Sequence, residues 1–482
     1  MPSMKNHFVQ VVDRARQMSS LGRINKRSRS GSVTASQLSC VPMELWLKIF
    51  SYLTTPWDIK AATLTCLVFR QLAQPLLFTK ICTHPPPPSM ALLGTGTQTN
   101  KYRRRTSQRL EFFLSPLIAP AVRECWIDPP SPEDDDLPTD VLINAIFDGL
   151  RKLPNLKVLG CRSIRLTPKR LAVLQRLTLT TLTLESCPSD LVDFTRLPAV
   201  PLSYVTFKYH GPVSQDIILP PLLSLFLSPR HLQRLSATST DILPVIVRSR
   251  PFARLTILEI PIPCLQHDLL IPALTHCPAV ERVTLHTLDS EGPLPRADAL
   301  ASLPAEILPN LNFYRGPRNY ALLFASGRPM KTVEISVPCK AHRLLRTLGR
   351  LNCTLDYVSF RIDGPIPATL LASVHALFPT LRTLSVNDPA VTTGELQTLF
   401  AETPPQPAVR LFRIRVEGRD KYHLWIPPME EAADAMACFK KTLADFERVY
   451  PNLLTLKFHY GLEDGAVVWR RSNSSQKFIQ VT

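Results

Sequence analysis

Glycine is scarce in this chain, at 16 of 482 residues, whereas proline is frequent, at 46. So few glycines argue against a flexible glycine-rich linker protein. So many prolines argue against long uninterrupted helices, because proline cannot continue one. Long apolar runs are missing too: the most apolar stretch, 217–227, contains two prolines and is much shorter than the ~20 residues that span a bilayer. The N-terminal residues are interrupted by charges and lack the apolar core of a secretory signal. We therefore expect a protein of the cytoplasm, the nucleus or both, without a membrane partner.

Familiar catalytic and metal-binding motifs are also missing. The chain contains no GxxxxGK[ST], GxGxxG, GxSxG or HExxH. Its 11 cysteines include no CxxC pair, and their odd number favours free, buried thiols in a reducing compartment. Cys264, His267, His276 and Cys277 lie close in sequence, but their spacing is not one of the usual zinc spacings, so we interpret them as core or loop residues. We expect a protein that is not an enzyme, with no catalytic residues, no metal and no cofactor.

Acidic residues are outnumbered, and the formal net charge is +17. Such a surplus favours an acidic partner, but it is concentrated in short segments. Residues 1–36 carry seven Lys/Arg and one Asp, and residues 101–109 carry five Lys/Arg and no acid. Basic tails are usually solvated or targeting segments, so we consider nucleic acid an unlikely partner. The sequence predicts a disordered basic segment over 1–36 and a linker, first proline-rich and then basic, over 83–118.

A dense helical pattern follows the basic segment, between residues 38 and 81. Pro42 stands where a first helical turn tolerates proline, and the apolar residues that follow it recur at helical spacing. This helix is predicted to stop before Pro56, and Asp58 is placed to cap a second helix. A third apolar run begins at Leu67. Three short helices bury little surface by themselves, so part of the apolar stripe is expected to face a partner. The alternative is a plain helical cap on the next domain.

The segment VPMELWLKIFSYL…DIKAATLTCLVFRQLAQPLLF resembles an F-box of the form found in many fungal proteins. The matching positions are Pro42, Glu44, Leu45, Ile49, Phe50, Leu53, Asp58, Cys66, Phe69, Arg70, Leu72 and Ala73. The chain departs from the family at Val41, where Leu is usual, and at Leu67, where Arg is frequent. The resemblance covers residues 37–82.

This resemblance implies docking onto the Skp-family adaptor of an SCF (Skp–cullin–F-box) ubiquitin ligase, and through that adaptor contact with a cullin. An apolar helical surface with a few polar groups at its rim is suited to such docking. The residues that the resemblance assigns to the docking face are Pro42, Leu45, Ile49, Phe50, Leu53, Leu67, Val68 and Phe69.

Beyond residue 120 the chain repeats the pattern hydrophobic-x-x-hydrophobic-x-hydrophobic. The first hydrophobic residues of the clearest copies are Leu156, Leu202, Leu232, Leu255, Val280, Met330, Leu355, Leu381, Val409 and Leu453, and weaker copies begin at Val122, Leu179 and Leu311. A spacing of about 25 residues lies in the range of leucine-rich repeats, and the last two hydrophobic positions alternate as the inward face of a strand does. Several copies have proline two residues before the first position, where it ends the preceding helix and presets an extended entry.

The fold class that we predict is α/β (α+β): a short three-helix F-box followed by a leucine-rich-repeat-like solenoid with a parallel strand face. We assign 119–462 to the solenoid and 463–482 to a C-terminal tail. An ordinary α/β domain with several short strands is the alternative.

In such a solenoid, the residues between the inward positions form a concave strand face where large partners bind. Basic side chains dominate there, at Arg162, Lys208, Arg234, Arg282, Arg315, Arg361, Arg413, Arg415 and Lys457, while the acids are Glu185, Glu259 and Glu334. We hypothesise that this face binds an acidic or phosphorylated protein segment, because arginine makes bidentate contacts with such groups. The substrate-binding residues that we name are Arg282, Arg315, Arg361, Arg413, Arg415 and Lys457. Alternatively, these side chains only keep the surface soluble.

The sequence therefore predicts a substrate-recognition subunit of an SCF-type ligase. Two other functions remain open: a scaffold that binds nucleic acid or chromatin, and an F-box scaffold that acts outside a ligase.

Overall fold

The structure is a computed structural model of the chain. It describes residues 42–53, 55–83, 107–128, 139–189, 199–208, 220–239, 241–262, 267–286, 303–325, 327–364, 366–387, 399–416, 444–460, 466–471 and 478–481. The segment 1–36 and most of the linker assigned to 83–118 lie outside these residues. The chain divides into two compact units, 1–78 and 79–482, and each is described by itself.

The first unit contains three short helices, α3 (Met43–Ser51), α4 (Pro56–Thr63) and α5 (Leu67–Leu77). Helix α3 begins directly after Pro42, so Pro42 is its N-cap and not a residue of its first turn, as the sequence had suggested. Helix α4 also begins at a different cap from the one expected. Thr55 is the N-cap: its Oγ1 accepts the Asp58 backbone N–H at 3.2 Å and donates to the Asp58 carboxylate at 2.7 Å. Asp58 is therefore a first-turn residue that pairs reciprocally with the N-cap Thr55. Pro56 occupies the start of the helix, where no backbone N–H donor is required.

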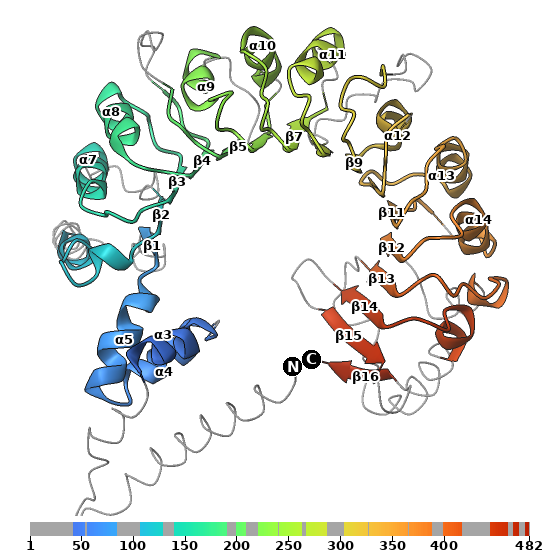
Figure 1. Ribbon diagram of the computed structural model, residues 1–482, viewed down its shortest axis with the longest axis horizontal. Helices are drawn as coiled ribbons and strands as arrows, with labels where there is room; N and C mark the ends of the chain where they lie inside the picture. The colour runs from blue at the N-terminus through green and yellow to red at the C-terminus, as the bar shows by residue number, and fades with distance from the viewer. Residues whose placement is uncertain are drawn as a thin grey trace, which may run out of the picture. The chain divides into compact units, whose positions relative to one another are not determined.

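The second unit contains one long sheet whose strands follow chain order from β1 to β16 in the described residues. Strands β1 to β14 pair in parallel, and β15 and β16 add to the end in antiparallel fashion. Taken by itself, this unit has its strands on the inner side of an arc and its helices on the outer side (Figure 1). The strands are β1 (Lys80–Thr83), β2 (Glu124–Ile127), β3 (Val158–Arg162), β4 (Thr181–Glu185), β5 (Tyr204–Lys208), β6 (Arg234–Ala237), β7 (Ile257–Pro261), β8 (Arg282–His286), β9 (Phe313–Gly316), β10 (Thr332–Ile335), β11 (Tyr357–Arg361), β12 (Thr383–Asn387), β13 (Leu411–Val416), β14 (Thr455–Tyr460), β15 (Ala466–Arg471) and β16 (Phe478–Val481).

Helices connect most of these strands along the outer side (Figure 1). They are α7 (Thr139–Leu150), α8 (Pro168–Arg176), α9 (Pro220–Phe226), α10 (Ile242–Arg248), α11 (His267–Thr275), α12 (Arg318–Ala325), α13 (Ala341–Leu348) and α14 (Leu370–Leu377). Most are shorter than three turns, and four of them, α8 to α11, contain proline, as the composition predicted. The predicted solenoid with a parallel strand face is confirmed.

Every predicted repeat is a strand, which begins two residues after the first hydrophobic position. All thirteen of these first residues are buried, from Val122 to Leu453. The two following hydrophobic positions also point into the core, as Val205 and Phe207 of β5 do. One such side chain buried from water contributes about 1.5–3 kcal/mol, so a repeated row of them supplies the driving force for stacking the repeats.

Proline before a repeat has a more specific role than ending a helix. Leu156 donates its backbone N–H to the carbonyl of Leu153 at 3.3 Å, and Leu453 does the same to Tyr450 at 3.0 Å. Pro154 and Pro451 are thus the second residues of four-residue turns, a position that the fixed φ of proline favours. The hydrogen bond that closes the turn comes from the first residue of the repeat, so the turn sets where the strand begins.

The sheet extends beyond both predicted limits of the solenoid. Strand β1 falls in the segment that we assigned to the F-box, and its Ile81 is buried. The predicted tail, 463–482, contains β15 and β16 instead of irregular chain. None of these three strands carries the full hydrophobic pattern, because Thr83, Asp464 and Gln476 occupy hydrophobic positions of it, so the periodic pattern did not reveal them. Antiparallel strands need only short turns, which fits the small spacing between β14, β15 and β16.

A cluster of aromatic side chains closes the core near the C-terminal repeats. Phe400, Phe412, Phe446 and Tyr450 are fully buried, with ring centroids 4.3 Å apart for Phe400 and Phe446. His375 joins this cluster through its Nε2, 3.1 Å from the Tyr450 hydroxyl. Burial lowers the pKa of His375 to about 4, so the ring is neutral at pH 7.

Candidate protein-binding surfaces

The three-helix unit has a small core of its own. Phe50, Leu72 and Ala73 are buried at its centre, and Trp46 and Phe69 pack against them. The Trp46 and Phe69 ring centroids lie 4.6 Å apart, and Phe50 meets Phe69 edge to face at 5.0 Å. These aromatic contacts fix how α3 and α5 pack together.

Large apolar side chains remain exposed on this unit. Leu67 is 67% exposed and Leu45 is 50% exposed. The other large apolar residues exposed on the unit are Met43, Leu47, Tyr52, Trp57 and Leu64. Seven such residues on three short helices form a larger apolar surface than a small monomeric unit normally leaves in water, and surfaces of this kind mark protein interaction sites.

The docking residues expected from the sequence fall into three groups. Pro42, Leu45 and Leu67 are exposed, and Phe50 is buried, with 3% of its surface accessible. The remaining four are partly buried against the core: Ile49, Leu53, Val68 and Phe69. Phe50 therefore packs in the core beneath the exposed surface. The apolar residues of α3 are divided between the core of the unit and the surface that is expected to face a partner.

Sequence reasoning missed several of the exposed apolar residues. Trp57 lies in the first turn of α4, where Lys60 Nζ is 5.4 Å from its ring centroid. Leu64 lies just after the last turn of α4. Neither belongs to the apolar stripe of its helix. Both could have been found in the sequence as large apolar residues at helical positions whose spacing predicts exposure to solvent.

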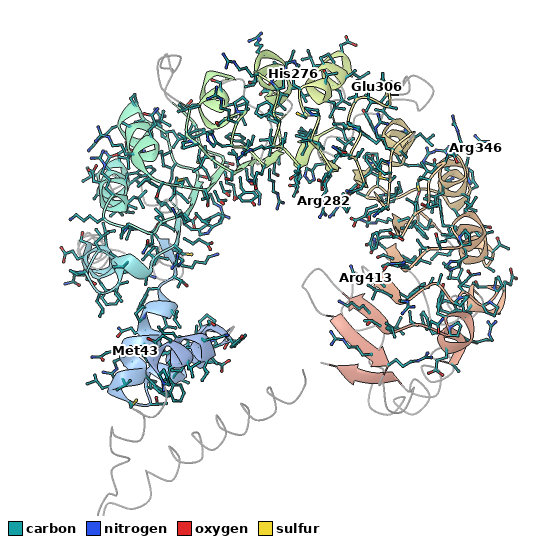
Figure 2. The ribbon with its side chains drawn as sticks, in the orientation of Figure 1. Met43, His276, Arg282, Glu306, Arg346 and Arg413 are labelled. Atoms are coloured by element: carbon teal, nitrogen blue, oxygen red, sulfur yellow. The ribbon has the colours of Figure 1, made fainter. Side chains whose placement is uncertain are left out.

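The second candidate surface is the inner strand face of the sheet. Successive side chains of a strand point to opposite faces, so the residues that alternate with buried core positions lie on this inner face. Arg282 and Arg413 are two of them, and both are seen on the inner side of the arc in Figure 2. We call the set of these residues on β1–β14 the inner face.

Charges on the inner face are balanced over strands β1 to β7. Lys80 pairs with Glu124 at 2.7 Å, and Arg234 pairs with Glu259 at 2.8 Å. Arg162 donates to both carboxylate oxygens of Glu185, at 2.8 and 3.3 Å, and its Nε lies 4.0 Å from Asp128. Two of the basic residues predicted to face a partner are therefore already paired within the protein.

Positive charge is in excess over strands β8 to β14. The basic residues there are Arg282, Arg315, Arg361, Arg413 and Lys457, and Glu334 is the acid among the described side chains of this part of the face. Arg315 Nε lies 3.7 Å from Glu334. Of the six predicted substrate-binding residues, these five lie on one part of the face, and the side chain of Arg415 lies outside the described residues.

The described cysteines are all free: Cys66, Cys82, Cys125, Cys161, Cys187, Cys277, Cys339 and Cys353. Burial raises the pKa of Cys125 and of Cys277 to about 12, so both are thiols at neutral pH and poor nucleophiles. Cys264 lies outside the described residues, and His276 is on the outer side of the arc (Figure 2). Within the described ranges, no group of three His, Cys, Asp or Glu side chains is placed to hold a metal ion.

Comparison with known proteins gives one family match, over the three helices and β1. Residues 38–84 match the family model described as F-box-like. No curated protein matches the chain. The F-box-like segment therefore supports an F-box protein, and the repeat unit carries no family assignment of its own. Among the described helices, none combines the length and the apolar character that crossing a membrane requires.

Proposed function

We propose that this chain is a substrate-recognition subunit of an SCF-type ubiquitin ligase. In this proposal the F-box-like segment binds a Skp-family adaptor, and through it a cullin, while the inner face of the sheet binds the target protein. The protein itself is not an enzyme, because transfer of ubiquitin is carried out by other subunits. Its place is the cytoplasm, the nucleus or both.

One observation carries this proposal: exposed apolar side chains cover a helical segment that matches the F-box-like family model. A partner that covers Leu45 and Leu67 removes about half to two thirds of each leucine from water. At about 1.5–3 kcal/mol for a fully buried leucine, each contact is worth about 1–2 kcal/mol, or roughly tenfold in affinity. The docking face that we propose centres on Leu45 and Leu67, flanked by Pro42, Ile49, Leu53, Val68 and Phe69, with Phe50 holding it in place from the core.

The proposal is tested by affinity purification of the tagged chain from cells that contain the ligase subunits. The variant Leu45→Asp/Leu67→Asp is expected to lose both the adaptor and the cullin. Leu454→Asp is the matched control, because Leu454 is 48% exposed and lies on the sheet unit instead. Recovery of adaptor and cullin with the double variant at the wild-type level would overturn the proposal. Partners that both variants retain are candidate targets.

Two alternative functions make different predictions in the same experiment. An F-box scaffold outside a ligase would retain the adaptor but recover no cullin with the wild-type chain. A nucleic-acid-binding scaffold would bind nucleic acid with an affinity that falls steeply as salt increases. The balanced charges over β1 to β7 favour a protein target instead, since each acid on that part of the face would repel a phosphate backbone.

A further inference from the structure

The turns that lead into strands β2 to β14 line one edge of the sheet, which we call the entry edge. One backbone hydrogen bond joins each turn to the next. The Lys157 N–H donates to the Arg123 carbonyl at 2.8 Å, and the Thr180 N–H donates to the Lys157 carbonyl at 2.9 Å. The same bond recurs in every turn as far as Leu454, which bonds to Arg410 at 2.8 Å. The entry edge is therefore a continuous row that follows the arc of the strands (Figure 1).

From β2 to β7 the entry edge carries charge of one sign. The turns contain no acid over residues 114–123, 151–157, 177–180, 199–203, 227–233 and 249–256. Their exposed basic residues, together with the last residues of α8 and α10, form what we call the basic edge: Arg123, Arg151, Lys152, Lys157, Arg176, Arg230, Arg248, Arg250 and Arg254.

The same edge has no such excess beyond β7. Its exposed basic residues there are Lys331, Arg350, Arg382 and Arg410, and its acids are Glu281, Glu306, Asp356 and Glu402. The uniform charge is thus confined to the half of the edge that lies over β2 to β7. Six strands at 4.7–4.9 Å spacing make this half about 24 Å long.

The basic edge has few partners within the protein. Lys157 Nζ lies 3.3 Å from the Thr178 carbonyl in the neighbouring turn. Among the described residues, the other eight side chains make no hydrogen bond, ion pair or ring contact. Helix dipoles account for two of them, since Arg176 and Arg248 lie in the last turns of α8 and α10. The remaining charges have no structural role in the part of the chain that the structure describes.

An exposed aromatic ring lies beside the middle of the basic edge. The turn 199–203 carries no charge, but Tyr204 follows it directly and is 40% exposed. Its hydroxyl donates to Gln233 Oε1 at 3.3 Å, which orients the ring. Basic groups that follow a backbone, together with aromatic rings on which bases stack, are the usual means of binding single-stranded nucleic acid.

Other anionic partners fit this surface less well. Folded protein surfaces carry both signs of charge, so their own basic groups would meet a surface without acids. Anionic membranes are held stably by basic groups together with an apolar anchor, and Leu117 is the one large apolar side chain exposed in these described turns. A nucleic-acid duplex is straight over this length, because its persistence length is about 50 nm. A single strand can bend along the arc.

We infer that the basic edge binds a single-stranded nucleic acid, whose phosphates accept hydrogen bonds from the arginines while a base stacks on Tyr204. The arginine fork suits phosphate because it donates two parallel hydrogen bonds. Counting charges along the sequence argued against a nucleic-acid partner, because the nine residues come from five separate parts of the chain. The fold brings them together.

This site is separate from the docking face and from the inner face. The acids of the inner face beside it are Glu124, Glu185 and Glu259, and each is paired with a basic residue of that face. They therefore do not neutralise the basic edge, and they keep a chain of phosphates off the inner face. Nucleic-acid binding thus adds a second activity to the proposed ligase subunit and does not replace target binding.

The test measures binding of the full chain to short labelled probes by fluorescence anisotropy. The probes are an oligouridylate, an oligothymidylate and a duplex of the same length, and flotation with phosphatidylserine vesicles tests the membrane. We expect at least one single strand to bind tenfold tighter than the duplex, and the comparison of the two shows whether the strand is RNA or DNA. The logarithm of the binding constant should fall with the logarithm of salt concentration with a slope of about −3.5, the value for about five phosphates on a single strand.

A triple variant in one turn locates the site. Arg248→Gln/Arg250→Gln/Arg254→Gln should weaken single-strand binding at least tenfold and make the salt slope less steep by about 2. The matched control is Lys340→Gln/Arg343→Gln/Arg346→Gln, which removes the same charge from exposed residues in and next to α13; Arg346 lies on the outer side of the arc (Figure 2). The control should bind as the wild type does, because salt screens charges that lie more than about 10 Å away.

A variant of the aromatic ring separates stacking from charge. Tyr204→Ala should weaken single-strand binding about tenfold and leave the salt slope unchanged, because stacking involves no charge. Each variant must keep the melting temperature of the wild type.

Three outcomes would overturn the inference: equal affinity of the two triple variants, tighter binding of the duplex or of the vesicles than of both single strands, or no binding of any probe. None of them concerns the adaptor, so the proposed function would stand. Leu45→Asp/Leu67→Asp should lose the adaptor but bind the single strand as the wild type does, which keeps the two tests apart.

Discussion

Arg328 offers a sharp test of how the repeat unit is held together. Its side chain is 5% exposed and donates to five backbone carbonyls. Within the segment before β9, the acceptors are Leu303 at 3.2 Å, Pro304 at 2.6 Å and Ile307 at 2.7 Å. Leu323 and Phe324, in the last turn of α12, accept at 3.4 and 3.3 Å. One guanidinium therefore ties the end of α12 to the segment that leads into β9.

Replacing Arg328 with methionine keeps much of the side-chain volume and removes every donor. Carbonyls at the end of α12 have no partner within the helix, so several buried acceptors lose their hydrogen bond together. One buried unsatisfied group costs about 1–3 kcal/mol. Desolvation of the charge, which also lowers the pKa of Arg328, is relieved by the substitution and offsets part of this cost. We expect a net loss of about 3–5 kcal/mol in the free energy of unfolding, which is the cost of several unsatisfied carbonyls less the relief of desolvation.

Urea denaturation followed by circular dichroism measures this loss as a shift in midpoint at constant slope. Arg346→Met is the matched control, because Arg346 is exposed on α13, and it should change stability by no more than about 0.5 kcal/mol. Hydrogen exchange should show faster exchange first in α12 and in residues 303–308. A loss below about 1 kcal/mol for Arg328→Met would refute the reasoning, since it would mean that the five carbonyls need no donor.

Two further predictions concern pH and packing. The pKa of His375 is about 4 in the folded protein and about 6.5 in an unfolded chain. The free energy of unfolding should therefore fall by roughly 3 kcal/mol as the pH is lowered from 6.5 to 4. A His375→Gln variant with the same pH dependence as the wild type over this range would contradict the prediction. At Gly160, an added Cβ would lie 2.3 Å from the Trp126 ring, so Gly160→Ala should displace the indole, change its fluorescence and cost about 1–3 kcal/mol. Gly149→Ala meets only the ends of leucine side chains, of which Leu114 is nearest at 3.0 Å, and should leave Trp126 fluorescence unchanged.

The repeat unit was largely predictable because its pattern is local and is repeated many times. Each strand from β2 to β14 starts two residues after a hydrophobic residue that the pattern identifies, such as Leu202 before Tyr204. Strand β1 was missed because its third pattern position, two residues after Ile81, is Thr83 and not a hydrophobic residue. Strands β15 and β16 were missed because antiparallel strands at the end of a sheet need neither the turn nor the helix of a repeat.

The binding surfaces were less predictable, for two physical reasons. Helical periodicity identifies an apolar stripe but does not show which of its residues are buried and which are exposed. Phe50 and Leu45 were therefore both assigned to the docking face, although Phe50 is buried where α3 packs on α5 and Leu45 is exposed. On the inner face, charge counting treated Arg162 and Arg413 alike. Their difference depends on register, which places Glu185 beside Arg162 and a serine, Ser385, beside Arg413.

The central claim is that the exposed apolar surface of the F-box-like segment binds a Skp-family adaptor. Its most direct test is the dissociation constant between the purified chain and a purified adaptor, measured by isothermal titration calorimetry. We predict that Leu45→Asp/Leu67→Asp weakens binding about 100-fold, from about 1–2 kcal/mol lost at each leucine, while Leu454→Asp leaves it unchanged. Equal affinity of the double variant and the wild type, with the three helices still folded, would contradict the account.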